Sequence, residues 1–170
     1  MVGYWYMTPE EKNEKLKNDP GSVHFTLIYS YMTYFVPVIL GMILDYILPN
    51  YSFNNSTLHA VGFWIIIVSS LLIYWAQSTT GKSKKKMFEK GEQREFARGP
   101  YKYNRNPTYV GLVAMTFGLG LVMGSIFVTA LVVVSALFSK FVFLPREEKI
   151  LELKYGQIYR DYKKKVKNWL

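Results

Sequence analysis

The sequence predicts an all-α membrane protein, a polytopic bundle of about four transmembrane helices, the last two a hairpin, plus a C-terminal amphipathic cytoplasmic helix. The chain of 170 residues is 50% hydrophobic and 19% charged, whereas soluble domains are roughly 25% charged. Its apolar residues form long blocks that are almost free of charge. Its charged residues, 21 Lys and Arg against 12 Asp and Glu, gather between and after these blocks. This separation indicates helices that alternate between bilayer and water.

The composition also excludes several kinds of chemistry. The chain has no cysteine, which excludes disulfides, thiolate zinc sites, iron–sulfur clusters and a cysteine nucleophile. With His24 and His59 as its two histidines, no metal site is predicted. A soluble protein with buried helices is the alternative to a membrane protein. A chain of this length has little room for about 80 residues of nearly uncharged helix in a soluble core.

The apolar blocks define the expected helices in order. Residues 25–48 contain one charge, at Asp45, and residues 57–77 contain none. Each block is near the roughly 20 residues that span a bilayer. The third block, 107–142, has one charge at Lys140 and is long enough for two short helices, with a glycine-rich turn near 122–125. The expected spans are therefore 24–48, 57–77, 107–122 and 125–143.

Lys and Arg predict how these helices are oriented. Segment 78–106 carries nine basic residues and segment 144–170 carries eight, whereas loop 49–56 carries none. Because basic loops stay cytoplasmic, both termini and segment 78–106 are expected on that side. Nucleic-acid binding is disfavoured, since no matching fold signature accompanies the charge. The chain is expected to be one membrane domain, 1–170, divided into N-terminal segment 1–23, helices 24–77, basic loop 78–106, hairpin 107–143 and C-terminal segment 144–170.

The segment after Pro145 has the pattern of an amphipathic helix. Apolar and aromatic residues recur at helical spacing at Leu151, Tyr155, Ile158, Tyr159, Tyr162, Val166 and Trp169. Basic residues occupy the other face, at Lys149, Lys154, Arg160, Lys163, Lys164 and Lys167. The pattern predicts an interfacial helix whose basic face meets lipid phosphates.

Two polar clusters flank the expected hairpin on its cytoplasmic side. Residues 99–111 bring tyrosines, amides and Arg105, and residues 146–148 bring Arg146 and two carboxylates. A hairpin would place both clusters at its open end. Arginine can pair a carboxylate, and tyrosine rings can cover a sulfonium by cation–π attraction. Taken singly, the clusters are more typical of structural roles, Arg105 and the tyrosines as interface anchors and Glu147 and Glu148 as first-turn acids at a helix N-terminus.

Together the clusters match a family pattern. The chain reads Gly99-Pro100-Tyr101, then Arg105-Asn106-Pro107-Thr108-Tyr109-Val110-Gly111, Gly118-Leu119-Gly120, Glu147-Glu148, and Tyr155-Gly156 followed by Tyr159, Tyr162 and Val166. In order and spacing this resembles the integral-membrane methyltransferases that include isoprenylcysteine carboxyl methyltransferase and phospholipid (phosphatidylethanolamine) N-methyltransferase. The resemblance covers residues 99–166.

The resemblance implies S-adenosylmethionine as the methyl donor and a lipid or lipidated acceptor, either a phospholipid amine or an isoprenylcysteine-like carboxylate. It implies donor-binding residues at Tyr101, Arg105, Asn106, Pro107, Tyr109, Gly111, Gly118, Gly120, Glu147, Glu148, Tyr155, Gly156, Tyr159 and Tyr162, with the last four on a lid helix. It implies catalytic roles for Arg146, Glu147 and Glu148, which would bind the donor or orient the acceptor.

The chain departs from the family pattern at two points. Asn106 replaces the histidine of the His-Pro pair and cannot serve as a proton-transfer base, although the phospholipid branch also uses Asn-Pro. The carboxyl-methylating branch usually has an arginine several residues before Glu-Glu, whereas residues 141–145 contain none. Two other functions stay open, an NADPH-dependent membrane reductase and a non-catalytic protein that binds anionic lipid. The run from Gly120 to Gly124 fits helix dimerisation, and an intrachain turn explains it as well.

Overall fold

The computed structural model describes residues 8, 10, 14, 21–90 and 96–168. Within these residues the chain is helical, and the one β-feature is an isolated bridge between Ser52 and Ser125. The prediction of an all-helical protein is therefore confirmed. The elements are α2 (Gly21–Ile47), η1 (Pro49–Tyr51), α3 (Ser56–Lys90), η2 (Gly99–Lys102), α4 (Pro107–Met123), α5 (Ile126–Phe138), the π turn η3 (Ser139–Phe143), α6 (Leu144–Tyr155) and α7 (Gln157–Lys165). Trp169 and most of segment 1–23 lie outside the described residues.

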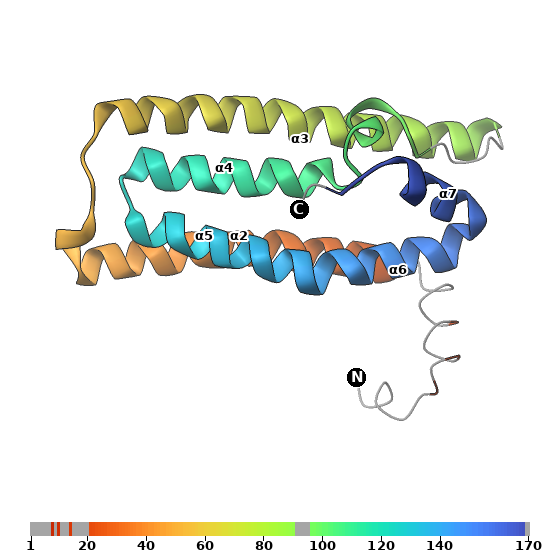
Figure 1. Cartoon of the computed structure of the whole chain (residues 1–170), viewed down its shortest axis with the longest axis horizontal. Helices are drawn as coiled ribbons and strands as arrows, with labels where there is room; N and C mark the ends of the chain where they lie inside the picture. Colours follow the sequence, from red (N-terminus) through yellow and green to blue (C-terminus); the bar gives the residue numbers. More distant parts are fainter. Residues whose placement is uncertain (1–7, 9, 11–13, 15–20, 91–95, 169–170) are drawn as a thin grey trace.

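Helices α2, α3, α4 and α5 lie side by side in the bundle (Figure 1). Helix α3 packs on α4, α4 on α5, and α5 on α2. Glycines allow the closest approaches, because a side chain at Gly62 or Gly118 would strike the backbone carbonyl of the other. A side chain at Gly41 would likewise strike Val128 on α5. The apolar blocks thus pack through small residues, as helices in membranes do.

The turn between α4 and α5 lies where the glycines predict it. Gly124 ends α4 with a φ of 67°, a left-handed conformation that favours glycine. Ser125 then caps α5, and its Oγ accepts a hydrogen bond from the Val128 amide at 2.9 Å. Gly124 therefore ends α4, Ser125 begins α5, and together they form the turn of the hairpin.

Three boundaries differ from the expected ones. Helix α3 continues to Lys90, so part of the expected basic loop 78–106 is helix, because lysine is a good helix former once a helix leaves the apolar layer. Helix α5 continues through η3 into α6, and the widened π turn lies directly before Pro145, whose missing N–H leaves one bond of the continuous helix unmade. The expected single amphipathic helix is broken at Gly156, which has a φ of 56° and a ψ of −127°.

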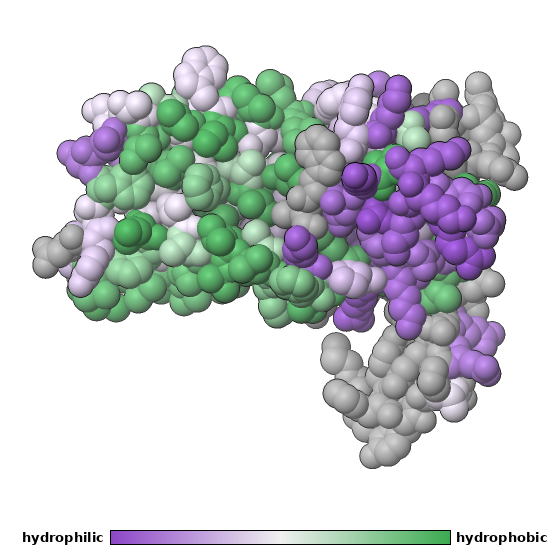
Figure 2. Space-filling view, viewed as in Figure 1, coloured by the Kyte–Doolittle hydropathy of each residue, from purple (hydrophilic) through white to green (hydrophobic). Residues whose placement is uncertain are grey.

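The surface divides along the length of the bundle. Figure 2 shows hydrophobic residues over most of the bundle and hydrophilic residues gathered at the end that carries α6 and α7. Two helical stretches are long and apolar enough to cross a membrane, Ser56–Lys82 and Ile126–Tyr155, and shorter apolar helices occupy Tyr31–Ile47 and Pro107–Met123. Large apolar side chains such as Phe63, Trp64 and Val134 are exposed, which suits contact with lipid rather than water.

Candidate active site

Charged side chains from three separate elements meet at the hydrophilic end of the bundle. Arg105, just before α4, lies 3.2 Å from Glu148 on α6. Lys163 on α7 lies 2.9 Å from Glu148 and 2.9 Å from Glu152. We call Arg105, Glu148, Glu152 and Lys163 the ionic cluster. The side chains of Arg105 and Glu148 are only 13% and 12% exposed, so water screens this pair weakly.

The ionic cluster leaves hydrogen-bond donors unused. Among the described residues, the Nε and Nη1 atoms of Arg105 and the Nδ2 atom of Asn106 are buried without a hydrogen-bond partner. The backbone around them is held in place, because the Arg105 amide donates to the Lys167 carbonyl and the Asn106 amide to the Asn104 side chain. Buried donors without partners are costly and rare in folded proteins. Their presence in a well-held loop suits a site that a polar ligand completes.

An aromatic cluster, Phe96, Tyr155, Tyr159 and Tyr162, lies beside the ionic cluster. The Phe96 ring centroid is 5.0 Å from that of Tyr155, 5.1 Å from that of Tyr159 and 5.4 Å from that of Tyr162. Tyr159 and Tyr162 are buried, and Leu151 and Val166 pack on the same group. These contacts attach α7 and the end of α6 to the segment that precedes η2.

Two hydrogen bonds link α7 to the rest of the site. The Tyr162 hydroxyl donates to the Tyr101 carbonyl at 2.8 Å, and Thr80 on α3 donates to the Tyr101 hydroxyl at 3.1 Å. Tyr101 therefore connects α7 to α3. Gly156 lies immediately before α7, and its φ of 56° is one that residues with a side chain rarely adopt.

The electrostatic environment keeps the two α7 tyrosines neutral. Burial raises the pKa of Tyr159, and the nearby carboxylates of Glu148 and Glu147 raise it further, against the opposing effect of Arg105. Burial also raises the pKa of Tyr162. The hydrogen bonds to Glu152 and Glu148 raise the pKa of Lys163. The tyrosines therefore stay protonated, and Lys163 stays charged, at every physiological pH.

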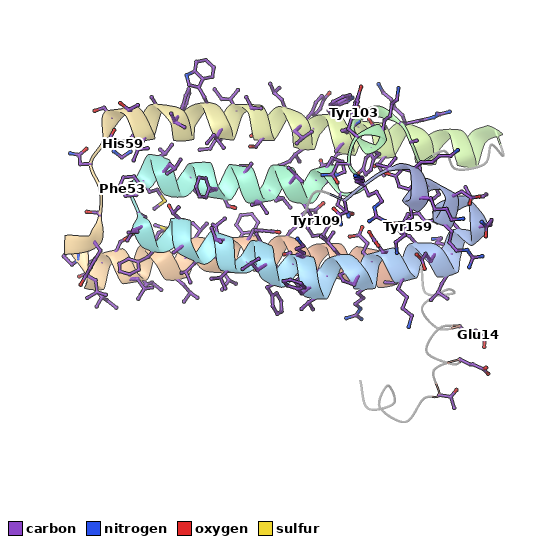
Figure 3. All side chains as sticks on the ribbon, in the orientation of Figure 1. Glu14, Phe53, His59, Tyr103, Tyr109 and Tyr159 are labelled. Atoms are coloured by element: carbon purple, nitrogen blue, oxygen red, sulfur yellow. The ribbon has the colours of Figure 1, made fainter. Side chains whose placement is uncertain are left out.

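The structure brings together most of the residues that the sequence singled out. Around the ionic and aromatic clusters lie Tyr101, Arg105, Asn106, Glu147, Glu148, Tyr155, Gly156, Tyr159 and Tyr162. Pro107 is fully buried at the first position of α4, immediately after these residues. Figure 3 shows Tyr159 on α7 at this end of the bundle, whereas Phe53 and His59 lie at the other end.

Other predicted residues lie apart from this group. Tyr109 belongs to an apolar cluster with Tyr34, Leu112 and Leu144. Arg146 is exposed and precedes Glu148 by two positions, about 200° around the helix. Its side chain is thus directed away from that of Glu148.

The three predicted glycines of α4 pack against neighbouring helices. Gly111 lies against Ile73 of α3, Gly118 against Gly62 of α3, and Gly120 against Thr129 of α5. Gly118 and Gly120 are also roughly 16 to 20 Å along α4 from Pro107. The structure gives these glycines packing contacts and does not bring Gly118 or Gly120 to the ionic cluster.

Two residues of the site were missed by sequence reasoning. Phe96 is the ring on which three tyrosines converge, and its signal was an apolar aromatic residue between charged ones, Glu95 before it and Arg98 after it. Lys163 was assigned to a face that meets lipid phosphates, whereas it pairs with Glu148 and Glu152. A helical pattern predicts which residues share a face of one helix. It does not predict the residue on another helix with which a member of that face forms an ion pair.

Comparison with known proteins supplies the family. No curated protein and no solved structure matched the chain. The family described as Phospholipid methyltransferase matches residues 56–158, which run from the start of α3 into the start of α7 and include the Arg105–Glu148 pair. This match covers more than half of the chain and agrees with the resemblance seen in the motifs. The chain therefore belongs to the phospholipid methyltransferase family, a family of methyltransferases.

Proposed function

We propose that the protein is an S-adenosylmethionine-dependent methyltransferase that methylates a lipid or another membrane-soluble acceptor at the cytoplasmic membrane face. In this proposal α2, α3, α4 and α5 cross the bilayer, and both termini lie in the cytoplasm. The observation that carries it is the ionic cluster, whose buried donors on Arg105 and Asn106 lack partners at the hydrophilic end of an apolar bundle. Family membership favours this function over an NADPH-dependent reductase or a non-catalytic lipid-binding protein.

The residues of the site fit the chemical groups of the donor. The free Nε and Nη1 atoms of Arg105 and the Nδ2 atom of Asn106 suit the donor carboxylate. The Glu148 carboxylate, which belongs to the ionic cluster, suits its ammonium group or its ribose hydroxyls. The aromatic cluster suits the purine ring and the sulfonium, since tyrosine faces attract cations.

The two glutamates have different surroundings and therefore different proposed roles. Both oxygens of Glu148 are engaged, one by Arg105 and the other by Lys163, so Glu148 holds Arg105 in place. Glu147 lies close enough to Tyr159 to influence its titration and takes no part in those two ion pairs. We assign to Glu147 the acceptance of the proton that an amine acceptor loses.

The bound donor would supply a methyl group on a positively charged sulfur. An acceptor lone pair would take that methyl group, and Arg105, Asn106 and the aromatic cluster would hold the donor in position for the transfer. The protein would hold the donor and the acceptor in line and exclude water from them. Helix α7, tied down by Tyr162 and Lys163, would keep water from the reacting atoms.

The acceptor is proposed to approach sideways from the bilayer. A lipid amine suits this site better than a prenylcysteine carboxylate. In this proposal Glu148 and the donor carboxylate occupy Arg105, Glu148 and Glu152 occupy Lys163, and Arg146 is directed away on the exposed side of α6. A carboxylate acceptor beside two glutamates would be repelled without a free cation.

Calorimetric titration of detergent-purified protein with S-adenosylmethionine tests this function, with NADPH as the comparison ligand. We expect micromolar donor binding, no NADPH binding, and at least tenfold weaker donor binding in Glu148→Gln. The matched control is Lys149→Gln, which changes the adjacent exposed charge and should bind as the wild type does. Absence of donor binding by folded protein, or binding of NADPH, would overturn the proposal.

A second assay addresses the acceptor. Labelled methyl transfer is measured into vesicles that contain dioleoylphosphatidylethanolamine and, separately, into an S-prenylated cysteine. Transfer to the phospholipid is expected, and Glu147→Gln should lower the turnover number while leaving donor affinity within about threefold. Transfer to the prenylcysteine alone would contradict the assignment of an amine acceptor.

A further inference from the structure

A tyrosine of α2 and a glutamine of α3 come together near the hydrophilic end of the bundle. Tyr31 is partly buried and packs on the apolar cluster that contains Tyr34 and Tyr109. A side-chain hydrogen bond joins Tyr31 to Gln77. Helices α2 and α3 each pack on α4, so this bond links two helices that share α4 as a neighbour. We call Tyr31 and Gln77 the Tyr–Gln pair.

The Tyr–Gln pair lies close to the carboxylate proposed to accept a proton. Tyr31 is near enough to Glu147 and to Tyr101 for electrostatic interaction with both. Glu148, the next residue on α6, belongs to the ionic cluster. Because consecutive residues of a helix point about 100° apart, the two carboxylates have different neighbours. Glu147 therefore lies near Tyr31 on α2, in addition to Tyr159 of the aromatic cluster.

The position of Gln77 along α3 corresponds to the level of lipid headgroups. Gln77 is the last residue of the uncharged block 57–77, and the basic segment begins directly after it. Tyr74 and Trp75, which precede it, are 72% and 49% exposed, and these residue types are enriched where a membrane meets water. Gln77 is itself exposed, so a headgroup can reach it from the membrane surface.

The chemistry of the pair suits an amine that still carries hydrogen atoms. The Gln77 carbonyl oxygen and the Tyr31 hydroxyl oxygen have lone pairs that accept hydrogen bonds, and one bond between the two side chains leaves some of these lone pairs available. A primary amine has N–H groups to donate to them. A quaternary ammonium has none, and it would gain only the attraction of the tyrosine ring.

We propose that Tyr31 and Gln77 bind the amine headgroup of the acceptor lipid and hold its nitrogen beside Glu147. This inference rests on the proposed lipid methyltransferase function and names the residues that recognise the acceptor. It also gives the site a preference for an unmethylated headgroup over a fully methylated one. Tyr31 lies on α2, outside the residues that match the family, so acceptor recognition draws on a helix that this match does not cover.

Binding of short-chain lipids tests the site without turnover. The probes are dihexanoylphosphatidylethanolamine and dihexanoylphosphatidylcholine, which share a phosphate and differ in the N–H groups of the headgroup. Calorimetric titration of the detergent-purified wild type should show tighter binding of the ethanolamine lipid. Tyr31→Phe and Gln77→Met should each weaken that binding about three- to tenfold, the effect of one neutral hydrogen bond. Binding of the choline lipid should stay within about twofold.

Tyr74→Phe is the matched control, because it removes the hydroxyl of an exposed tyrosine three residues before Gln77 on the same helix. It should bind both lipids as the wild type does. In all three variants the affinity for S-adenosylmethionine should equal that of the wild type, which also shows that they fold. Equal weakening for the two lipids, or the same loss in Tyr74→Phe, would overturn the inference.

Methyl transfer into dioleoylphosphatidylethanolamine vesicles separates acceptor binding from proton transfer. Tyr31→Phe and Gln77→Met should raise KM for the lipid and leave the turnover number nearly unchanged, whereas Glu147→Gln should lower the turnover number. A wild-type KM in both Tyr31→Phe and Gln77→Met would overturn this inference and leave the proposed function standing. Failure of the folded wild type to bind the methyl donor would overturn the proposed function instead.

Discussion

The two ends of the bundle use polar residues in opposite ways. At the end formed by residues 48–55 and the α4–α5 turn, the polar groups complete the backbone. His59 Nδ1 lies 3.0 Å from the Leu121 carbonyl and 2.9 Å from the Val122 carbonyl, the last acceptors of α4. The Phe53 amide donates to the Gly124 carbonyl at 2.9 Å. We call this the closed end.

At the other end, which carries the ionic cluster and which we call the ionic end, ion pairs join separate helices and some buried hydrogen-bond donors have no partner among the described residues. Arg105, Glu148 and Lys163 come from three different elements, and two nitrogens of Arg105 have no partner among the described residues. The protein would be more stable if these donors had partners or were absent, since an unpaired buried donor costs about 1–3 kcal/mol. The contrast supports the proposal that a ligand binds at the ionic end, whereas the polar groups named at the closed end serve folding.

The largest expected effect comes from Arg105 at the ionic end. In Arg105→Gln the charge and most donors are lost, and Glu148 keeps only Lys163, so donor affinity should fall by at least about 100-fold. Arg105→Lys keeps the charge without the planar set of donors and should recover part of the affinity. Calorimetry with S-adenosylmethionine measures both. Full affinity in Arg105→Gln would remove Arg105 from the site.

The second effect concerns folding at the closed end. In Gly124→Ala the new Cβ would strike the Phe53 carbonyl, and a left-handed φ adds about 1–2 kcal/mol. We expect a total loss of about 2–4 kcal/mol in unfolding free energy. The control is Gly81→Ala, where a Cβ meets nothing within 4 Å and alanine should stabilise the helix. Thermal unfolding in detergent checks the pair, and equal stabilities would contradict the role given to Gly124.

The sequence predicted the closed end better than the ionic end, for a physical reason. Apolar blocks and the glycines near 122–125 act locally, so they located α2 to α5 and the turn at Gly124. The pairing of Lys163 with Glu148 joins residues on different helices and depends on the break at Gly156. Both halves of the broken helix keep the amphipathic pattern, so the pattern alone could not reveal the break.

Part of the ionic end was nevertheless predicted from motifs. The Arg105–Glu148 pair joins the two polar clusters that the sequence placed at the open end of the hairpin. Gly118 and Gly120 were grouped with these residues because they lie in the same motif, yet they pack against Gly62 and Thr129. A motif records which residues a family shares, and some of those residues serve helix packing.

A smaller effect is expected from Lys163, which attaches α7 to α6. Its side chain is 39% exposed, so its ion pairs are partly screened, and Lys163→Gln should weaken donor binding about three- to tenfold. Lys164→Gln is the matched control, because Lys164 is 75% exposed and pairs within α7 with Asp161. Equal effects of the two changes would indicate that α7 responds only to net charge. A loss confined to Lys163→Gln would support a helix held down by the ionic cluster.

The smallest effect is a weakening of α7 attachment at alkaline pH. Burial raises the pKa of Tyr159 and Tyr162, so these side chains favour the docked helix while they are neutral. Their contribution is complete below pH 10, the ordinary tyrosine pKa, and declines as pH rises above it, because only the detached helix can release the protons. At pH 10 the loss should be about 0.4 kcal/mol per tyrosine.

Donor affinity, measured between pH 8 and pH 10.5, should fall as the attachment of α7 weakens. Tyr159→Phe should lessen the alkaline decline, because it removes one of the two ionisable groups that α7 buries. Tyr103→Phe is the control, since the Tyr103 side chain is 61% exposed and lies outside α7. An unchanged decline in Tyr159→Phe would place the titrating group elsewhere. A lessened decline would link α7, the one part of the ionic end that Gly156 separates from the long helices, directly to donor binding.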